Sequence, residues 1–398
     1  MVIFIKLSYL SQALPQIFTY LFLQLKVGKV GKVGDFTVWI LKVLLAVVNE
    51  RKWSIGRDSK GMNTGHHNRV CPKTIIKPSN ALRLMNIING SDILKHYAEQ
   101  DRNFQNLDLS RIDLKSADIN GIDFSHANLN SADLSYTNLS DTSLIWTDLN
   151  RANLRQANLT QACLVHSSLF WADLKEATLV SANLSNALLD RANLTSACLN
   201  GANLTEASLE GACLVKAVLS QANLFKANLK GADFTGANLN EANLRQTKWE
   251  GAILSQASLQ RVDLEESQLN ETILRKVDLT EADLVKVDLR YADLTEAILS
   301  RVALELANLV GADFSRATLK QASLFQANLE GAVLRDTNMV KADLRHTNFK
   351  DTQLMGSDFS GSRVKGACFT DAQGLTCQQK QWLRANGALN IPVKQVSI

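Results

Sequence analysis

The stretch ANLRQANLT, residues 152–160, holds two copies of one five-residue unit: a small residue, Asn or Asp, Leu, and two variable residues. The unit repeats without insertion or deletion from Asp101 to about Asp371, with an apolar centre at every fifth residue from Phe104 to Phe369. Leu occupies 43 of these 54 centres, and Ala occupies 34 of the positions two residues earlier. A short fixed period sustained over this length is typical of a solenoid, in which each unit packs only against its neighbours.

A period of five matches neither an α-helix nor a β-strand, so each unit must combine an extended segment with a turn. The small residue and the central Leu are two residues apart, so both lie on the inner side of the extended segment. Asn or Asp before the centre can hydrogen-bond the nearby backbone, and Gly after it tolerates a positive φ. The residues that define this expected core include Leu154, Leu159, Leu164, Leu169 and the largest centre, Trp249.

These units match the A(D/N)LXX signature of the pentapeptide-repeat family, which the chain resembles over about two thirds of its length. The resemblance implies an all-β fold, a right-handed quadrilateral β-helix with four units per coil and an interior filled by Leu and Ala. Four units contain twenty residues, so residues twenty apart are expected to stack on one face. About 54 units would then form a rod of roughly 65 Å at a strand spacing of ~4.8 Å.

The sequence divides into four segments. They are an apolar, basic segment 1–61, a linker and helical N-cap 62–100, the repeats 101–373, and a C-terminal capping helix and tail 374–398. Within 62–100, short helices are expected over about 80–88 and 92–100, the second with Ser91 or Asp92 as its N-cap. Its apolar residues should cover the first coil; they are Ile93, Leu94 and Tyr97.

The C-terminal segment carries the signals of a second cap. Thr376 and Gln379 are three residues apart, which indicates a capping box. A helix from about residue 377 to 386, ending at Gly387, would place Trp382 and Leu383 over the last coil. A homodimer interface is the alternative role for this helix.

The first 61 residues allow three interpretations. No residue from Leu7 to Leu25 is charged, and this run is long enough to cross a bilayer. Residues 1–48 are therefore expected either to associate with a membrane or to form a small soluble helical cap. In the third interpretation, the native protein starts at Met62 and the preceding residues are an upstream extension. The expected location is accordingly the cytoplasm or a membrane surface.

The formal net charge of +4 conceals an uneven distribution. Residues 1–100 carry a net +9, residues 101–373 a net −8, and the tail from Gly374 a net +3. Within the repeats, acidic and basic residues alternate along positions twenty apart, as in the series Glu241, Arg261, Glu281 and Arg301. This pattern predicts ladders of ion pairs and no basic stripe, so direct binding of nucleic acid is not expected.

Catalysis would require a nucleophile, a base or a metal-ligand set that converges in a pocket. A rod with a filled interior offers flat or convex faces instead, and its Asp residues point to successive faces. The sequence therefore predicts a protein that is not an enzyme, with no catalytic residue, no cofactor and no metal. The four cysteines of the repeats also fall on different faces, so no disulfide between them is expected.

One cluster of outward positions is apolar, and we call it the aromatic patch. It lies where two adjacent faces meet on neighbouring coils and comprises Ile145, Trp146, Val165, His166, Phe170 and Trp171, with Arg151 and Arg191 one coil below and above Trp171. A guanidinium at either position can stack on the Trp171 ring. Exposed aromatic side chains rimmed by Arg are typical of protein-interaction sites. Coverage by the N-terminal segment or by a second copy of the chain is the alternative.

The leading functional hypothesis is a non-enzymatic protein-interaction scaffold, with a protein partner that the sequence does not identify. Membrane tethering through residues 1–48 accompanies this hypothesis. The family resemblance also implies an alternative, a DNA-mimicking regulator of a nucleic-acid enzyme such as DNA gyrase. Such mimicry implies a strongly negative surface, whereas the net −8 of the repeats is spread over columns of mixed sign.

Overall fold

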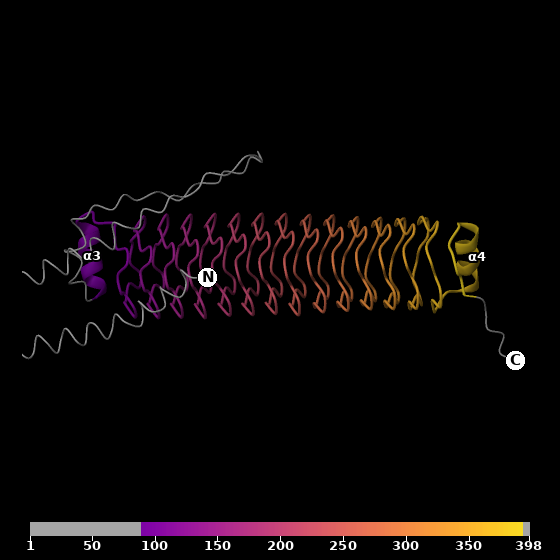
Figure 1. Cartoon of the computed structure of the whole chain (residues 1–398), viewed down its shortest axis with the longest axis horizontal. Helices are drawn as coiled ribbons and strands as arrows, with labels where there is room; N and C mark the ends of the chain where they lie inside the picture. The colour runs from indigo at the N-terminus through magenta and orange to yellow at the C-terminus, as the bar shows by residue number, and fades with distance from the viewer. Residues whose placement is uncertain (1–88, 393–398) are drawn as a thin grey trace, which may run out of the picture. The chain divides into compact units, whose positions relative to one another are not determined.

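The computed structural model describes residues 89–392. The expected membrane segment 1–48, the expected extension 1–61 and the expected helix over 80–88 lie outside these residues. Helix α3 spans Gly90–Ala98, helix α4 spans Cys377–Ala385, and the repeats wind between them along one axis (Figure 1). Across residues 89–392, neither helix has the length and apolar character that a bilayer crossing requires.

The repeats wind in coils of twenty residues. Single parallel β-bridges join the residue before each centre to the residue twenty positions later, from Asn103↔Asp123 to Gln353↔Gln373. Four five-residue units therefore complete one coil, as predicted from the period and the family resemblance. One residue per unit forms a bridge, so each side of a coil is a bridge flanked by turns and not a longer strand.

Every backbone N–H of a typical unit, residues 152–156, has an acceptor. The N–H of Ala152 closes a turn onto the carbonyl oxygen of Leu149 at 3.0 Å, and the N–H groups of residues 153, 154 and 156 donate to neighbouring coils at 2.7 to 3.0 Å. The remaining N–H, that of Arg155, donates to Oδ1 of Asn153 at 3.3 Å. The Asn or Asp before a centre therefore supplies the one acceptor that the coil backbone lacks.

The second residue after each centre has a positive φ in every unit from Asn106 to Asp371, and most of these residues are not Gly. The carbonyl oxygen of the centre accepts from the N–H three residues later, which closes a β-turn. A positive φ at the third turn residue is what a type II turn requires. Side chains at the two middle turn residues point outward, so they form the four corners of each coil.

The centres and the small residues fill the interior. Leu154, Leu159, Leu164 and Leu169 are fully buried, as predicted, and so is Trp249. The indole Nε1 of Trp249 donates to Oγ1 of Thr247 at 2.7 Å, and the indole ring packs 4.9 Å from the ring of Phe234.

Helix α3 caps the first coil, but its predicted N-cap was wrong. Asn89 is the N-cap and Asp92 is the third helical residue of a capping box, with distances of 3.2 and 3.3 Å. Ile93 is fully buried and Tyr97 packs against the core, whereas Leu94 is 41% exposed. Residues four apart share a helix face, and Leu94 is rotated about 100° from that face.

Helix α4 caps the last coil. Thr376 and Gln379 form the predicted capping box, with distances of 2.9 and 3.2 Å. Leu383 is fully buried and Trp382 packs against the core half-buried. After α4, Gly387 has a φ of +79°, and its carbonyl oxygen accepts the backbone N–H of Gly366 in the last coil at 2.8 Å. These contacts assign Leu383 to the core of the chain itself.

The described cysteines do not pair with one another. Cys198, Cys213, Cys368 and Cys377 are free thiols. Cys163 is disulfide-bonded, but not to any of these four. The prediction that no disulfide joins two cysteines of the repeats therefore agrees with the structure.

Candidate functional site

The aromatic patch occupies two neighbouring corners of adjacent coils. Its six apolar and aromatic residues are all middle turn residues, one or two positions after a buried Leu, so their side chains point outward. Trp146 and Trp171 are each 55% exposed, and Phe170 is exposed as well. Ile145, Val165 and His166 are partly exposed between them.

One corner holds two stacked rings. The rings of Trp146 and His166 have centroids 4.2 Å apart and planes 19° apart. The two residues are twenty apart, and the backbone N–H of Trp146 donates to the carbonyl oxygen of Val165 at 3.0 Å. The spacing of adjacent coils, about 4.8 Å, is close to the stacking distance of flat rings. The coil itself therefore fixes this pair.

The other corner holds a cation on a ring. The guanidinium carbon of Arg191 lies 5.2 Å from the centroid of the Trp171 ring, as predicted. Arg151 makes no such contact, so only one of the two predicted arginines stacks on the indole. A twenty-residue spacing places a long side chain near a ring, but it does not fix whether that side chain turns to the ring or to solvent.

Neither arginine of the patch forms an ion pair with any residue in the described range 89–392. Arg151 and Arg191 are both exposed, while eighteen ion pairs elsewhere link other charged residues of this range. Two uncompensated guanidinium groups therefore rim the aromatic patch. They are available to a carboxylate of a bound molecule.

Sequence reasoning missed one member of the patch, Leu188, which is 43% exposed. It stands directly before the centre Leu189, where Asn or Asp usually stands, and it bridges Ser168 and Ser208 on the side between the two corners. The signal was present in the sequence as an apolar residue at a position that is polar in most units. From here on, the aromatic patch includes Leu188.

A side chain from the preceding coil stabilises the backbone beneath the patch. Ser168 stands directly before the centre Leu169. In most units the residue at this position is Asn or Asp, and its side chain accepts the backbone N–H two residues later, which here is that of Phe170. Oδ1 of Asn150 accepts this N–H at 2.8 Å and also the hydroxyl of Ser168 at 2.7 Å. The turn that presents Phe170 and Trp171 is therefore hydrogen-bonded to the coil below.

Outside the patch, charges are paired along the columns of the rod, as predicted. Glu281 accepts a hydrogen bond from Nε of Arg261 at 2.8 Å and forms an ion pair with Arg301 at the same distance. The hydrogen bond from Arg261 and the charge of Arg301 hold the pKa of Glu281 below its usual range. In another column of residues twenty apart, the carboxylate of Glu296 lies 3.6 Å from Nζ of Lys276 and 3.3 Å from the guanidinium of Arg316.

A shallow depression lies between the last coils and helix α4. Its lining residues are Asp358, Phe359, Ser360, Gly361, Gln378, Gln379 and Trp382. The one titratable group of this lining is the carboxylate of Asp358, and hydrogen bonds from the hydroxyl and N–H of Ser360 hold its pKa below the usual range.

Solved structures similar to this chain include several pentapeptide repeat proteins. HetL of the cyanobacterium Nostoc, involved in heterocyst differentiation regulation, is 34% identical over 59% of this chain and 96% of its own, with a TM-score of 0.30. The plasmid-mediated fluoroquinolone resistance protein QnrB1 is 19% identical over 46% of this chain and 81% of its own, with a TM-score of 0.20. A thylakoid-lumen protein of Arabidopsis thaliana is 32% identical over 36% of this chain and 81% of its own, with a TM-score of 0.15.

Curated proteins compared with the chain return no match. The family model for pentapeptide repeats matches the chain in overlapping segments that together span residues 108–372. This match covers more than half of the sequence and coincides with the coils that the β-bridges define. The chain belongs to the pentapeptide repeat family.

Proposed function

We propose that this protein is a non-enzymatic interaction scaffold and that the aromatic patch binds a protein partner. The observation that carries the proposal is the exposure of Trp146, Phe170 and Trp171 on two adjoining corners and of Leu188 on the side between them. Membership of a repeat family is consistent with an interaction role. The surrounding surface is polar and ion-paired, so the patch stands out as the place where a partner would gain most from burial.

The patch is suited to binding in two ways. Trp and Arg are the residues that most often carry the energy of protein interfaces, and here both occur together. The Trp146 and His166 rings are already stacked, so little side-chain freedom is lost when a partner covers them. Arg151 and Arg191 favour a partner that presents carboxylates beside an apolar or aromatic anchor.

The test uses the full-length chain as bait for affinity capture. Trp146 and Trp171 are replaced together by Ser, and partner binding should fall sharply, since a central Trp typically contributes about 2 kcal/mol or more. A matched control replaces Leu306 and Tyr291 by Ser. These two lie in the same two columns further along the rod and are 50% and 62% exposed. The control should bind the partner like the parent.

Each outcome of this test has a clear reading. Equal capture by the parent and by the Trp variant would show that the patch is not the binding site. Equal loss in the control would show that capture reflects general surface hydrophobicity. Sedimentation of the purified parent and Trp variant over a range of concentrations distinguishes a different partner from a second copy of the chain, because only self-association would depend on the patch in the absence of other proteins.

The proposal includes two finer features. The first is a right-handed, quadrilateral path of the coils, which family membership supports and an experimental structure would test. The second is tethering to a membrane through residues 1–48, supported by the uncharged run from Leu7 to Leu25. Fractionation of cells that express the full chain, or a chain without residues 1–61, tests the tether. Equal membrane content of the two chains would refute it.

DNA mimicry is less well supported than scaffolding. The repeats carry a net charge of only −8, and acidic residues such as Glu281 are neutralised by arginines on adjacent coils. A duplex mimic requires rows of uncompensated negative charge. A DNA gyrase supercoiling assay separates the two functions, because a scaffold should leave supercoiling unchanged at micromolar concentration.

A further inference from the structure

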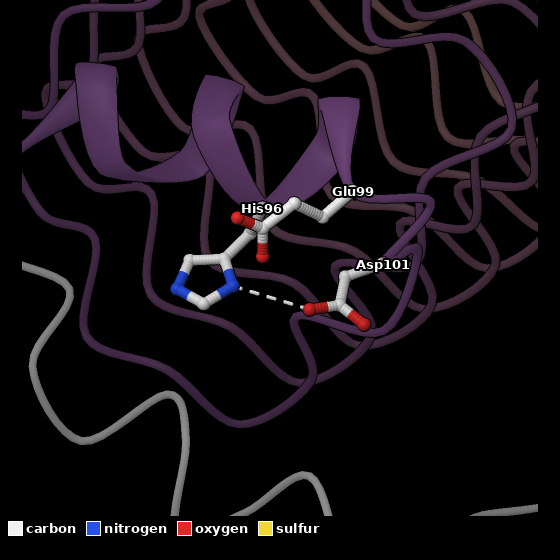
Figure 2. A group of neighbouring side chains, drawn as sticks. All are labelled: His96, Glu99 and Asp101. Carbon is white, nitrogen blue, oxygen red and sulfur yellow. Dashed lines mark hydrogen bonds and ion pairs between the residues drawn. The ribbon is translucent and has the colours of Figure 1, made fainter.

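Three metal-ligating groups meet at the C-terminal end of helix α3 (Figure 2). One ring nitrogen of His96 and one carboxylate oxygen each of Glu99 and Asp101 all lie within 4.8 Å of one another. Nδ1 of His96 and Oδ2 of Asp101 are 3.1 Å apart. The group lies at the junction between the N-terminal cap and the first coil.

The backbone at the end of α3 fixes this arrangement. His96 and Glu99 are three residues apart in the last turn, so they share one helix face. Gln100 then adopts a φ of +69°. The N–H of Gln100 donates to the carbonyl oxygen of Tyr97 at 3.0 Å, and the N–H of Asp101 donates to the carbonyl oxygen of His96 at 3.0 Å. This is a Schellman motif, and it returns Asp101 to the side of His96.

The two carboxylates lack a cationic partner among residues 89–392 apart from the imidazole itself. Asp101 forms its one ion pair of this range with His96, and Glu99 forms none. The nearest guanidinium, that of Arg102, donates to the carbonyl oxygens of Tyr97 and Asp101 at 2.7 and 3.1 Å and lies 3.6 Å from the Tyr97 ring centroid.

The local field at this junction favours a positive ion. Two carboxylates held this close repel each other, and the C-terminal end of a helix adds partial negative charge. The His96 and Asp101 side chains are only 22% and 21% exposed, so solvent screens them incompletely. A bound cation would relieve this repulsion.

We propose that His96, Glu99 and Asp101 bind a divalent transition-metal ion, and we take Zn²⁺ as the ion to test. One imidazole nitrogen and two carboxylate oxygens are donors that zinc accepts at about 2.0–2.2 Å, with water completing the coordination. The imidazole selects against Mg²⁺ and Ca²⁺, which prefer oxygen ligands. His96 would bind through Nδ1 as neutral imidazole, and the exposed Glu99 side chain would rotate to close the site.

The ion would fasten the N-terminal cap to the coils. His96 and Glu99 belong to the end of α3, whereas Asp101 begins the first repeat. A shared ion therefore links helix α3, which covers the first edge of the solenoid, to the first coil. Binding to the folded state alone would stabilise this junction by mass action.

The primary test compares zinc binding by the metal-free full chain and by its Glu99→Gln variant, using calorimetric titration. The Glu99 side chain is exposed and forms no hydrogen bond or ion pair with residues 89–392, so its replacement should leave the fold intact. We expect at least about tenfold weaker zinc binding in this variant, as for loss of a metal ligand. Zinc bound elsewhere by histidines or thiols appears equally in both titrations, so the difference reports this site.

A second pair of variants provides a matched comparison. The double variant His96→Gln/Asp101→Asn should also lose at least about tenfold in affinity. The control His346→Gln/Asp351→Asn makes the same changes at the same separation in the repeats and should bind zinc like the parent. Unchanged affinity in Glu99→Gln or in the His96→Gln/Asp101→Asn variant would overturn the proposal.

Hydrogen exchange adds a structural readout. Zinc should slow amide exchange in helix α3 and at Asp101 of the parent, while Mg²⁺ at the same concentration should not. Zinc that binds without any change of protection in α3 would place the ion elsewhere on the chain and would equally overturn the proposal.

Discussion

Gly311 and Gly331 form a matched pair for measuring what a corner side chain contributes to the coil. They occupy the same turn position on adjacent coils, with φ of +68° and +70°. A Cβ atom at Gly311 would lie 2.6 Å from two ring atoms of Tyr291, whereas one at Gly331 would meet nothing within 4 Å. Replacing each by Ala therefore separates the cost of the turn conformation from the cost of the contact.

The magnitudes follow from this difference. Gly331→Ala adds only a left-handed Ala, at about 1–2 kcal/mol, offset by about 0.4–1 kcal/mol because the unfolded chain becomes stiffer. Gly311→Ala must also displace the Tyr291 ring. That ring is 62% exposed, so it can turn toward solvent and need not compress the core. The added cost is then about 0.5–1.5 kcal/mol, the scale of a forced rotamer.

The assay must be local, because long repeat arrays depart from two-state unfolding. Native-state hydrogen exchange reports the amides at positions 311 and 331, which donate to the next coil at 3.0 and 2.9 Å. Gly311→Ala should destabilise its coil more than Gly331→Ala destabilises the next. In a Tyr291→Ala background, the two glycine substitutions should cost the same.

Two results would refute this reasoning. The two single variants could lose the same free energy of coil opening, to within the ~0.3–0.5 kcal/mol that applies to independent sites. This result would mean that the Tyr291 ring does not lie against position 311. A difference that persists after Tyr291→Ala would mean that another neighbour of position 311 causes it. Either outcome would also weaken the assignment of other corner contacts, including the ring stack of the aromatic patch.

Two further predictions concern the core and the charge ladders. Trp249→Leu should destabilise its coil by about 1–3 kcal/mol, since Leu leaves part of a fully buried indole volume empty and Thr247 loses its N–H donor. Native-state hydrogen exchange at the amide of residue 249, which donates to the carbonyl oxygen of Gln268 at 2.7 Å, measures this, and unchanged protection would contradict it. The hydrogen bond from Arg345 and the charges of Arg345 and Arg363 hold the pKa of Asp343 below its usual range. Stability from this carboxylate is thus present above the unfolded pKa of about 3.9 and lost as pH falls through the lower folded pKa. Asp343→Asn should therefore lower Tm at pH 7, and this loss should shrink as the pH falls below the unfolded pKa; a loss of Tm that stays constant over this range would contradict the prediction.

Much of the fold was predictable because the five-residue period, together with the four units per coil that the family resemblance implies, determines which residues are neighbours. Trp146 and His166 are twenty residues apart, so their proximity follows from the coil length alone. Thr376 and Gln379 were predictable as a capping box because that motif depends on local spacing. In both cases the physical cause acts over one repeat length or one helical turn.

The parts that could not be predicted depend on choices between near-equal options. Asn89, Ser91 and Asp92 are all residue types that can cap a helix, so local spacing alone did not identify Asn89 as the N-cap. Gln100 occupies a left-handed position that usually signals itself by Gly, so the return of Asp101 to His96 had no sequence signature. Leu188 departed from the repeat at a position where departures normally affect only hydrogen bonding.

The aromatic patch is not explained by the needs of the coil. The coil satisfies its backbone through carbonyl oxygens and Asn or Asp side chains, so it needs nothing from the apolar side chains at the corners. Trp146 and Trp171 nonetheless hold φ of +57° and +59°, a conformation that is costly for a bulky residue and that Gly adopts freely. They also leave large apolar surfaces in water. The second corner residue of every unit shares this positive φ, so what sets Trp146 and Trp171 apart is the large apolar surface that they leave in water, and the search for the proposed partner should begin at these two corners.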